Sequence, residues 1–382
     1  MEARVDRETF LHTLESVQAG LSPREVIEQS SCFVFRAGEV LTFNDETTCR
    51  AESGLGKELE GAIQAQKFTD LLHKLVEKEI ILELSEDSHL VVRGKGGRKA
   101  GIRMEADISL PVDTVEKPEE GSWKPLHEDF AEAVGIVQQC AGSDESQFAL
   151  TCVNLHPKWV ECTDNYQICR WRLRTGIAEA ALVRQSAIKH IVSLGMSEFA
   201  ETPSWLHFRS GSGLHLSCRR YLEDFPSLSK FLEVEGETII LPKGLGEAAD
   251  KANIFSSENV DNNTVEVTLA DGKLRIKGEG VSGWYTEPKK ITYSGPRLKF
   301  NVAPQMLIDL IKKHNECVIN AEKLKCDTGK FVYVACLTPP SDKAADDGEP
   351  EEESSKKKRK VEDSNGDSVI HKKKKAAAKE DE

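Results

Sequence analysis

Apolar and polar positions along this chain follow a pattern that returns after about 120 residues. Phe10 and Leu14 lie on one face of a helical period of about 3.6 residues, and Phe130 and Val134 repeat that face one interval later. A repeat this long is large enough to bury a core of its own, so it indicates tandem domains rather than a solenoid of small units.

A second helix pattern and a set of alternating runs also recur. Apolar helix faces surround Leu71, Ile191 and Leu310. Alternation at every second position predicts strand hairpins over residues 33–44, 153–163 and 265–277. The predicted helices cover residues 8–18, 67–78, 128–140, 185–194, 244–254 and 304–313. Each repeat therefore reads helix, hairpin, helix, hairpin, which predicts an α+β fold with two helices and largely antiparallel sheets in each domain.

The repeats divide the chain into three similar domains and a tail. The predicted boundaries are residues 1–120, 121–235, 236–338 and 339–382. After Leu337 the apolar residues almost disappear, and acidic and lysine blocks take their place. Such a composition cannot bury enough surface to offset the entropy of ordering, so the charged tail is expected to be disordered.

Composition narrows the class of protein. The chain has 51 Lys and Arg against 64 Asp and Glu, a net charge of −13, which argues against coating of nucleic acid but allows a local basic surface. Its ten cysteines form no CxxC pair, which favours reduced thiols in an intracellular protein. Neither a signal peptide nor an apolar run of membrane length occurs in the sequence, so a soluble protein is expected.

No catalytic or metal-binding motif stands out. The glycine-rich basic segment 93–99 precedes a strand, and no Ser or Thr follows Lys99, so a hairpin turn is favoured over a phosphate loop. The histidines occur singly, without the spacing of metal ligands, and GxSxG and HExxH patterns do not occur. The sequence favours a non-enzymatic protein with no cofactor and no metal. An enzyme whose site is assembled from distant positions is the alternative.

Cations recur on the polar faces of the predicted helices. Lysines on solvated helix faces are ordinary, but here an acidic chain places them on equivalent helices of its repeats. Stacked side by side, such helices would form a basic lining that contacts phosphates without reading bases. The expected DNA-facing residues are Arg24, Lys67, Lys74, Lys78, Lys189, His190, Lys251, Lys312 and Lys313.

Several short segments, in order over residues 1–337, resemble one known family. They are residues 5–11 (VDRETFL), 163–168 (TDNYQI), 224–231 (DFPSLSKF), 292–295 (TYSG) and 300–302 (FNV). Together with the three tandem repeats, they are similar to the bacterial beta sliding clamp, the processivity subunit of DNA polymerase III. The low similarity is typical of a divergent member, such as one encoded by a phage.

The resemblance implies a head-to-tail ring of two copies, with the helices facing the hole and the sheets outside. Edge strands of the first and third domains would pair across each junction between copies. Ile254 and Phe255 match family positions at that junction and would face Ile108 and Leu110. The implied partners are duplex DNA in any sequence, a replicative DNA polymerase, a clamp loader and a second copy of the chain.

The family also has a groove that receives short hydrophobic peptides of polymerase and loader. The matching positions are Thr163, Tyr166, Gln167, Ile168, Pro226, Lys230, Phe231, Asn301, Pro304, Val334, Ala335 and Leu337. Ile168, Phe231, Val334 and Leu337 are expected to line an apolar pocket; the alternative is that they are only strand-core residues. Asn165, Tyr166 and Gln167 replace the Gly-His-Arg of the family signature, so this wall is bulkier and less basic.

The favoured interpretation is a non-catalytic DNA sliding clamp that encircles duplex DNA and gives a polymerase processivity. The alternative is a clamp-like scaffold or inhibitor that binds replication partners without encircling DNA. The expected location is the cytoplasm, at the nucleoid and replisome. A nuclear location applies only if the tail cluster Lys356-Lys-Lys-Arg-Lys-Val361 acts as a localisation signal in a eukaryotic cell.

Overall fold

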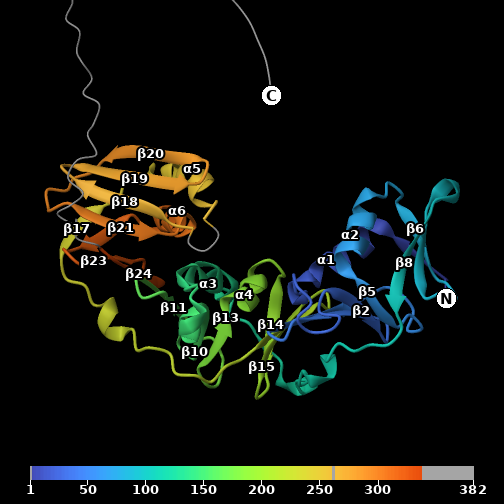
Figure 1. Cartoon of the computed structure of the whole chain (residues 1–382). Helices are drawn as coiled ribbons and strands as arrows, with labels where there is room; N and C mark the ends of the chain where they lie inside the picture. The colour runs from blue at the N-terminus through green and yellow to red at the C-terminus, as the bar shows by residue number, and fades with distance from the viewer. Residues whose placement is uncertain (1, 260–262, 338–382) are drawn as a thin grey trace, which may run out of the picture. The chain divides into compact units, whose positions relative to one another are not determined.

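The computed structural model describes residues 2–259 and 263–337 (Figure 1). Over these residues the chain forms six α-helices and 24 strands, and the strands assemble into sheets of 12, 8 and 4 strands. The ladders within these sheets are antiparallel, so the predicted α+β class is confirmed. The predicted tail, residues 339–382 with the basic cluster 356–361, lies outside the described residues.

Two helices fall in each repeat, as the periodicity predicts. Asp6 caps the first helix by accepting a hydrogen bond from the backbone N–H of Thr9 at 2.9 Å, which satisfies one donor that helix geometry leaves free. Pro304 opens the last helix, where its missing N–H costs nothing. The helices are α1 (Arg7–Ser16), α2 (Ala65–Lys74), α3 (Phe130–Val137), α4 (Gln185–Ile188), α5 (Leu245–Ser256) and α6 (Pro304–Lys313).

The helices of the second repeat are shorter than predicted. Residues 128–140 form α3 and then the 3₁₀ turn Gln138–Cys140, while residues 185–194 form α4 and then the 3₁₀ turn Lys189–Val192. The predicted lengths are therefore wrong. Apolar spacing places a segment on the core but does not distinguish i→i+4 from i→i+3 hydrogen bonding.

The strands of the first repeat are β1 (Glu2–Asp6), β2 (Cys32–Arg36), β3 (Glu39–Phe43), β4 (Thr47–Glu52), β5 (Gly61–Gln64), β6 (Glu79–Leu84), β7 (His89–Arg93) and β8 (Lys99–Glu105). Those of the second are β9 (Lys124–Pro125), β10 (Cys152–His156), β11 (Trp159–Thr163), β12 (Gln167–Arg172), β13 (Ala181–Arg184), β14 (Met196–Glu201), β15 (Trp205–Ser210) and β16 (His215–Arg219). Those of the third are β17 (Glu237–Ile240), β18 (Val265–Ala270), β19 (Lys273–Gly280), β20 (Gly283–Lys290), β21 (Leu298–Val302), β22 (Glu316–Ile319), β23 (Lys323–Asp327) and β24 (Phe331–Cys336).

The three predicted hairpins are confirmed as β2–β3, β10–β11 and β18–β19. Two of them use a two-residue turn with positive φ at both positions: Ala37 and Gly38 (53° and 87°), and Asp271 and Gly272 (50° and 69°). This is the backbone conformation whose twist matches that of the flanking strands. Local sequence therefore fixes the register of both hairpins.

The two largest sheets continue from one repeat into the next. In the 12-stranded sheet β4 of the first repeat pairs with β16 of the second, from His215↔Arg50 to Cys218↔Thr47. In the 8-stranded sheet β12 of the second repeat pairs with β24 of the third, from Gln167↔Ala335 to Trp171↔Phe331. The same rule operates twice: the fourth strand of one repeat joins the last strand of the next.

A connecting segment covers each of these two joints. The first segment, residues 106–123, contributes Leu110 to a cluster with Val34, Phe43 and Trp205, and Ile108 packs against this cluster. Only 4% of Leu110 is exposed. The sequence predicts that Ile108 and Leu110 form a contact between two copies of the chain, but Leu110 is already covered within one copy.

The second connecting segment, residues 220–236, covers the joint of β12 and β24. Its Leu228 is buried against Ile168, Val332 and Val334. Phe225, Leu232 and Val234 of the same segment pack around this cluster. Each joint between repeats thus combines main-chain hydrogen bonds in the sheet with an apolar seal supplied by the adjoining chain.

Replacing Leu110 by Ala tests the seal over the first joint. The change removes buried methyl groups and leaves a cavity, so we expect the free energy of unfolding to fall by about 2–5 kcal/mol in urea denaturation. Val26→Ala is the matched control, because Val26 is 86% exposed, and its effect should stay within about 0.5 kcal/mol. A Leu110 variant as stable as the control would contradict the packing described here.

Candidate functional site

The predicted DNA-facing residues lie on the helices or just beyond them. Lys67 and Lys74 are on α2, and Lys189 and His190 begin the 3₁₀ turn after α4. Lys251 is on α5. The others are Arg24 in the loop after the first helix, Lys78 just beyond α2, and Lys312 and Lys313 in the last turn of α6. All except half-buried His190 are exposed.

Carboxylates accompany these cations in a regular way. The first helix of each repeat (α1, α3, α5) carries one more acidic than basic residue. The second (α2, α4 with its 3₁₀ turn, α6) carries one more basic than acidic residue. The expected lining is therefore alternating in charge rather than uniformly basic, which weakens its attraction for phosphate.

Two of the predicted cations are already paired. Lys313 forms an ion pair with Glu132 of α3, which links the helices of the second and third repeats. Lys251 Nζ lies 3.6 Å from Glu287 Oε2. Hydrogen bonds from Lys289 and from Tyr285 lower the pKa of Glu287 to about 2, so this carboxylate stays charged. Lys251 and Lys313 are therefore less available to phosphate than the other lysines.

His190 contributes little positive charge. Burial, followed by the adjacent Lys189, lowers the pKa of His190 below its usual 6.5. At neutral pH its imidazole is uncharged. On the first repeat, His73 Nε2 lies 3.1 Å from Glu15 Oε1, so this histidine links α2 to α1.

The predicted peptide-groove residues do not form one open apolar pocket. Ile168 and Val334 face each other across β12 and β24 and are 8% and 2% exposed, because Leu228 covers them. Leu337 is also buried, whereas 52% of Phe231 is exposed. The expectation that Ile168, Phe231, Val334 and Leu337 line a common open pocket is wrong. Ile168, Val334 and Leu337 are core residues, which is the alternative that the sequence leaves open.

The remaining groove residues form a rim around the end of β24. Tyr166 is 75% exposed, and its carbonyl accepts a hydrogen bond from the backbone N–H of Cys336 at 2.7 Å. Lys323, which pairs with Cys336, places its Nζ 5.4 Å from the centre of the Phe231 ring. Two exposed aromatic rings thus flank one strand end. Among the other predicted positions, Pro226, Lys230 and Asn301 are exposed, whereas Thr163, Gln167, Pro304 and Ala335 are buried.

A hollow of about 730 Å³ adjoins this rim. Tyr166 and Gln167 line it together with Asp164, Asn165 and Ala303. Gln167 is held in place because Tyr333 Oη donates to its Oε1 at 3.0 Å and its Nε2 donates to Asp164 Oδ2 at 2.9 Å. Asn165, Tyr166 and Gln167, which differ from the Gly-His-Arg of the resembled signature, therefore line this hollow.

Several strands have an unpaired side in the described residues, and two of them, β20 and β8, bear on contact between copies. β20 pairs only with β19. β8 pairs with β7 over Lys99–Arg103 and with β5 at Met104 and Glu105, so Lys99–Arg103 have one open side. Ile254 is 67% exposed and Trp284 61%. Beside them, Gly283 lies so close to Phe255 that a Cβ there would come within 3.3 Å of the ring. Ile254 and Phe255 thus lie beside an open strand edge, while Ile108 and Leu110 do not; whether Ile254 and Phe255 contact another copy stays a prediction.

Among the described residues, no group of three or more His, Cys, Asp or Glu side chains is placed to hold a metal ion. Nor does any helix within residues 2–259 and 263–337 have both the length and the apolar composition that a membrane crossing requires.

Solved structures of bacterial sliding clamps match this arrangement. The DNA polymerase sliding clamp of Bacillus subtilis aligns over 89% of this chain and 100% of its own, with 14% identity and a TM-score of 0.65. The DNA polymerase III subunit beta of Bartonella birtlesii, solved with griselimycin, gives the same coverage with 16% identity and a TM-score of 0.68. The chain has the sliding-clamp fold. Its predicted resemblance is confirmed at the level of the fold, although no protein-family model and no curated protein matches the sequence.

Sequence reasoning missed several residues that the sliding-clamp fold brings to these surfaces. Ile102 of β8 and Trp284 of β20 lie on the two open strands, and Glu132 and Glu287 neutralise lysines. The alternation in residues 99–105 indicates a strand, but only the pairing of its residues shows that Lys99–Arg103 have an open side. The pairing of Lys313 with Glu132 joins residues far apart in sequence and leaves no local signal.

Replacing Glu132 by Gln tests whether α6 of this sliding-clamp fold faces DNA. The change frees the Lys313 ammonium for a phosphate. We expect a plot of log affinity against log salt for short duplex DNA, measured by fluorescence anisotropy, to steepen by about 1, because each neutralised phosphate adds about 0.9 to the slope. Glu79→Gln is the control, since Glu79 is exposed on β6 and has no ion pair in the described part of the chain. An unchanged slope for Glu132→Gln would remove Lys313 from the DNA-facing set.

Proposed function

We propose that this protein is a DNA sliding clamp: a ring of chains joined head to tail that encircles duplex DNA and tethers a DNA polymerase. The single observation that supports this most is the order of strands in the sheets. The fourth strand of the first repeat, β4, joins the last strand of the second, and the fourth strand of the second, β12, joins the last of the third. The three repeats are taken as three domains of such a ring.

By the same rule, the fourth strand of the third repeat, β20, requires the last strand of a first repeat, β8. Within one chain, β20 and the Lys99–Arg103 part of β8 stay unpaired on their outer sides in the described residues. Pairing β20 with β8 of another copy would satisfy both edges. Such a heterologous contact closes into a ring when its rotation closes. Ile254, Phe255 and Trp284 would meet Ile102 there, which replaces the predicted Leu110.

The charge pattern suits a ring that moves along DNA. A ring remains on DNA by topology, so its lining needs only weak phosphate contacts that do not depend on sequence. Helices of alternating net charge supply such contacts more weakly than a continuous basic face would. Exposed Lys67, Lys74, Lys189 and Lys312 are the proposed contacts, because no ion pair in the described residues engages them.

The rim formed by Tyr166 and Phe231 is the proposed contact for polymerase and clamp loader. Both rings are largely exposed beside the end of β24, and aromatic rings are frequent anchors of peptide recognition. A partner would bind across these rings and the adjoining hollow rather than in a preformed apolar pocket.

A second candidate is a clamp-like scaffold or inhibitor that binds replication proteins without encircling DNA. The observation that favours it is the neutral charge balance of the helices, because a DNA-lined hole would ordinarily carry an excess of cations. The two candidates differ in whether attachment to DNA depends on the DNA being circular.

The mass in solution tests ring assembly. We expect a species near twice 42.4 kDa by light scattering. Ile254→Asp places a charge on the proposed apolar contact and should raise the dissociation constant of the assembly at least about tenfold, a loss of roughly 1.4 kcal/mol. Ile240→Asp is the matched control, because Ile240 is 63% exposed on β17, away from β8 and β20. A wild-type chain that stays at 42.4 kDa at all concentrations would contradict the ring.

Retention on DNA tests encirclement. Linear duplex is ligated into a circle in the presence of the protein, so that rings already threaded become trapped without a loader. We expect the protein to co-elute with the circle and to be released when the circle is cut. A Lys74→Glu, Lys189→Glu, Lys312→Glu variant should associate roughly tenfold less before ligation, because three phosphate contacts become repulsive.

The control for that variant reverses three exposed lysines outside the helices, Lys57, Lys158 and Lys273, and should behave as wild type. Both variants should keep the wild-type mass. Equal retention on circular and cut DNA would contradict encirclement and favour the scaffold.

A further inference from the structure

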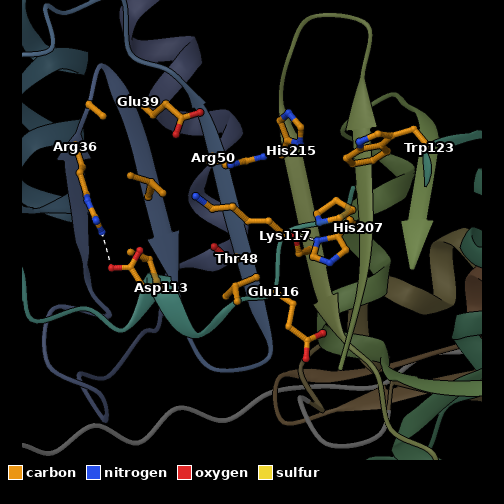
Figure 2. A pocket seen from close by; sticks show the side chains of 16 residues that line it. Arg36, Glu39, Thr48, Arg50, Asp113, Glu116, Lys117, Trp123, His207 and His215 are labelled. Atoms are coloured by element: carbon orange, nitrogen blue, oxygen red, sulfur yellow. Dashed lines mark hydrogen bonds and ion pairs between the residues drawn. The ribbon is translucent and has the colours of Figure 1, made fainter. Parts of the chain in front are cut away.

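The joint between β4 and β16 contains a pocket that the proposed clamp function does not use. Its volume is about 230 Å³, and we call it the junction pocket (Figure 2). Strands β3, β4, β15 and β16 form its floor, and the first connecting segment passes over it. Its lining includes Arg50, Lys117, Trp123, His207 and His215.

Some polar groups of the junction pocket are already satisfied by the protein. His207 bonds Ser217 Oγ through Nδ1 at 2.8 Å and Thr202 Oγ1 through Nε2 at 3.0 Å. Glu116 accepts hydrogen bonds from the backbone N–H and the hydroxyl of Ser204, both at 3.0 Å. A ligand could therefore bind His207 or Glu116 only by breaking these hydrogen bonds, which costs free energy.

The wall of the junction pocket beside Val112 is neutralised internally. Arg36 Nη1 donates to Asp113 Oδ2 at 2.8 Å, which offsets one cation with one carboxylate. Figure 2 shows this pair on the side of the pocket opposite Trp123. The ion pair therefore ties the connecting segment to β2 and leaves ligand recognition to the other wall.

The wall beside Trp123 carries hydrogen-bond donors that have no acceptor in the described part of the chain. Arg50 and His215 are directly opposite each other across β4 and β16, and Figure 2 shows them side by side. In the described residues, the Arg50 guanidinium, the Lys117 ammonium and the His215 imidazole have no hydrogen bond or ion pair. Trp123 packs edge-on against His215, with ring centres 5.6 Å apart, and closes the wall. Glu39 is the one lining carboxylate without a partner in the described chain.

Burial and the charge of Arg50 act on both histidines of the junction pocket. Burial, followed by the charges of Arg50 and Arg209, lowers the pKa of His215 to about 4. Burial and the charge of Arg50 lower the pKa of His207 to about 4 as well. Both imidazoles are uncharged at neutral pH, so Arg50 and Lys117 supply the cations, and the N–H of His215 remains a donor.

We propose that the junction pocket binds the phosphoryl group of a small molecule. The Arg50 guanidinium offers a planar fork that matches two phosphate oxygens, and Lys117 and the His215 N–H would donate to the remaining oxygens. The group would be either inorganic phosphate or the phosphate of a nucleoside monophosphate. Because β4, β16 and the connecting segment all line the pocket, the bound anion would stabilise the joint between the first two repeats. This proposal does not depend on ring formation.

Isothermal titration calorimetry on the full chain tests it, with sodium phosphate and adenosine 5′-monophosphate as separate titrants in constant ionic strength. We expect saturable binding of one equivalent. Arg50→Gln should raise the dissociation constant at least about tenfold. Arg4→Gln is the matched control, because Arg4 is exposed on β1 without an ion pair in the described chain, and it should bind as wild type.

Lys117→Gln provides a second variant that does not threaten folding, since Lys117 is exposed on the connecting segment, and it should also weaken binding. NMR titration of the histidine ring protons gives an independent readout: a bound anion offsets Arg50, so the pKa of His215 should rise. Equal affinity for the two titrants supports recognition of the phosphoryl group alone, and tighter nucleotide binding supports a nucleotide ligand. Absence of saturable binding, or affinity unchanged by both Arg50→Gln and Lys117→Gln, would overturn the proposal.

Discussion

Main-chain groups at a strand edge need hydrogen-bond partners, and this constraint organises the whole chain. The fourth strand of each repeat (β4, β12 or β20) has a side that its own repeat leaves unpaired. The last strand of each repeat (β8, β16 or β24) can pair with such a side. The chain satisfies this need twice internally, through β4–β16 and β12–β24. The helices, the connecting segments and the proposed assembly between copies all follow from where the sheets must continue.

Electrostatics is a weaker organiser here. The chain is acidic overall, and the helices that the fold brings together carry net charges of alternating sign. Ion pairs such as Lys313–Glu132 join helices of different repeats and consume cations in doing so. A surface of this kind holds a polyanion loosely. Loose contact is adequate for a protein retained by linkage and inadequate for one that depends on affinity.

Much of the fold could be predicted from the sequence, because the relevant signals are local. The amphipathic spacing and the N-terminal Pro304 predict α6 at its observed bounds, and the Ala37-Gly38 turn sets its hairpin. The candidate functional surfaces were harder to predict from the sequence, because their properties depend on neighbours that are far apart along the chain. Leu110 reads as an exposed contact until Trp205, from another repeat, covers it. Arg50 and His215 form a pocket wall only because two strands far apart in sequence pair. Ion pairs between residues far apart in sequence likewise decide which lysines remain available to contact phosphate.

The two connecting segments make the joints inside the chain mechanically stronger than a joint between two copies would be. Inside the chain, each joint has a covalent bridge and an apolar strap, with Trp205 and Leu110 over one and Leu228 over the other. A joint made between separate copies through β8 and β20 would have hydrogen bonds and side-chain contacts but no bridging peptide. Force applied to such an assembly would part it at this seam and leave the interior joints intact, so a factor that opens the ring would need to grip only there.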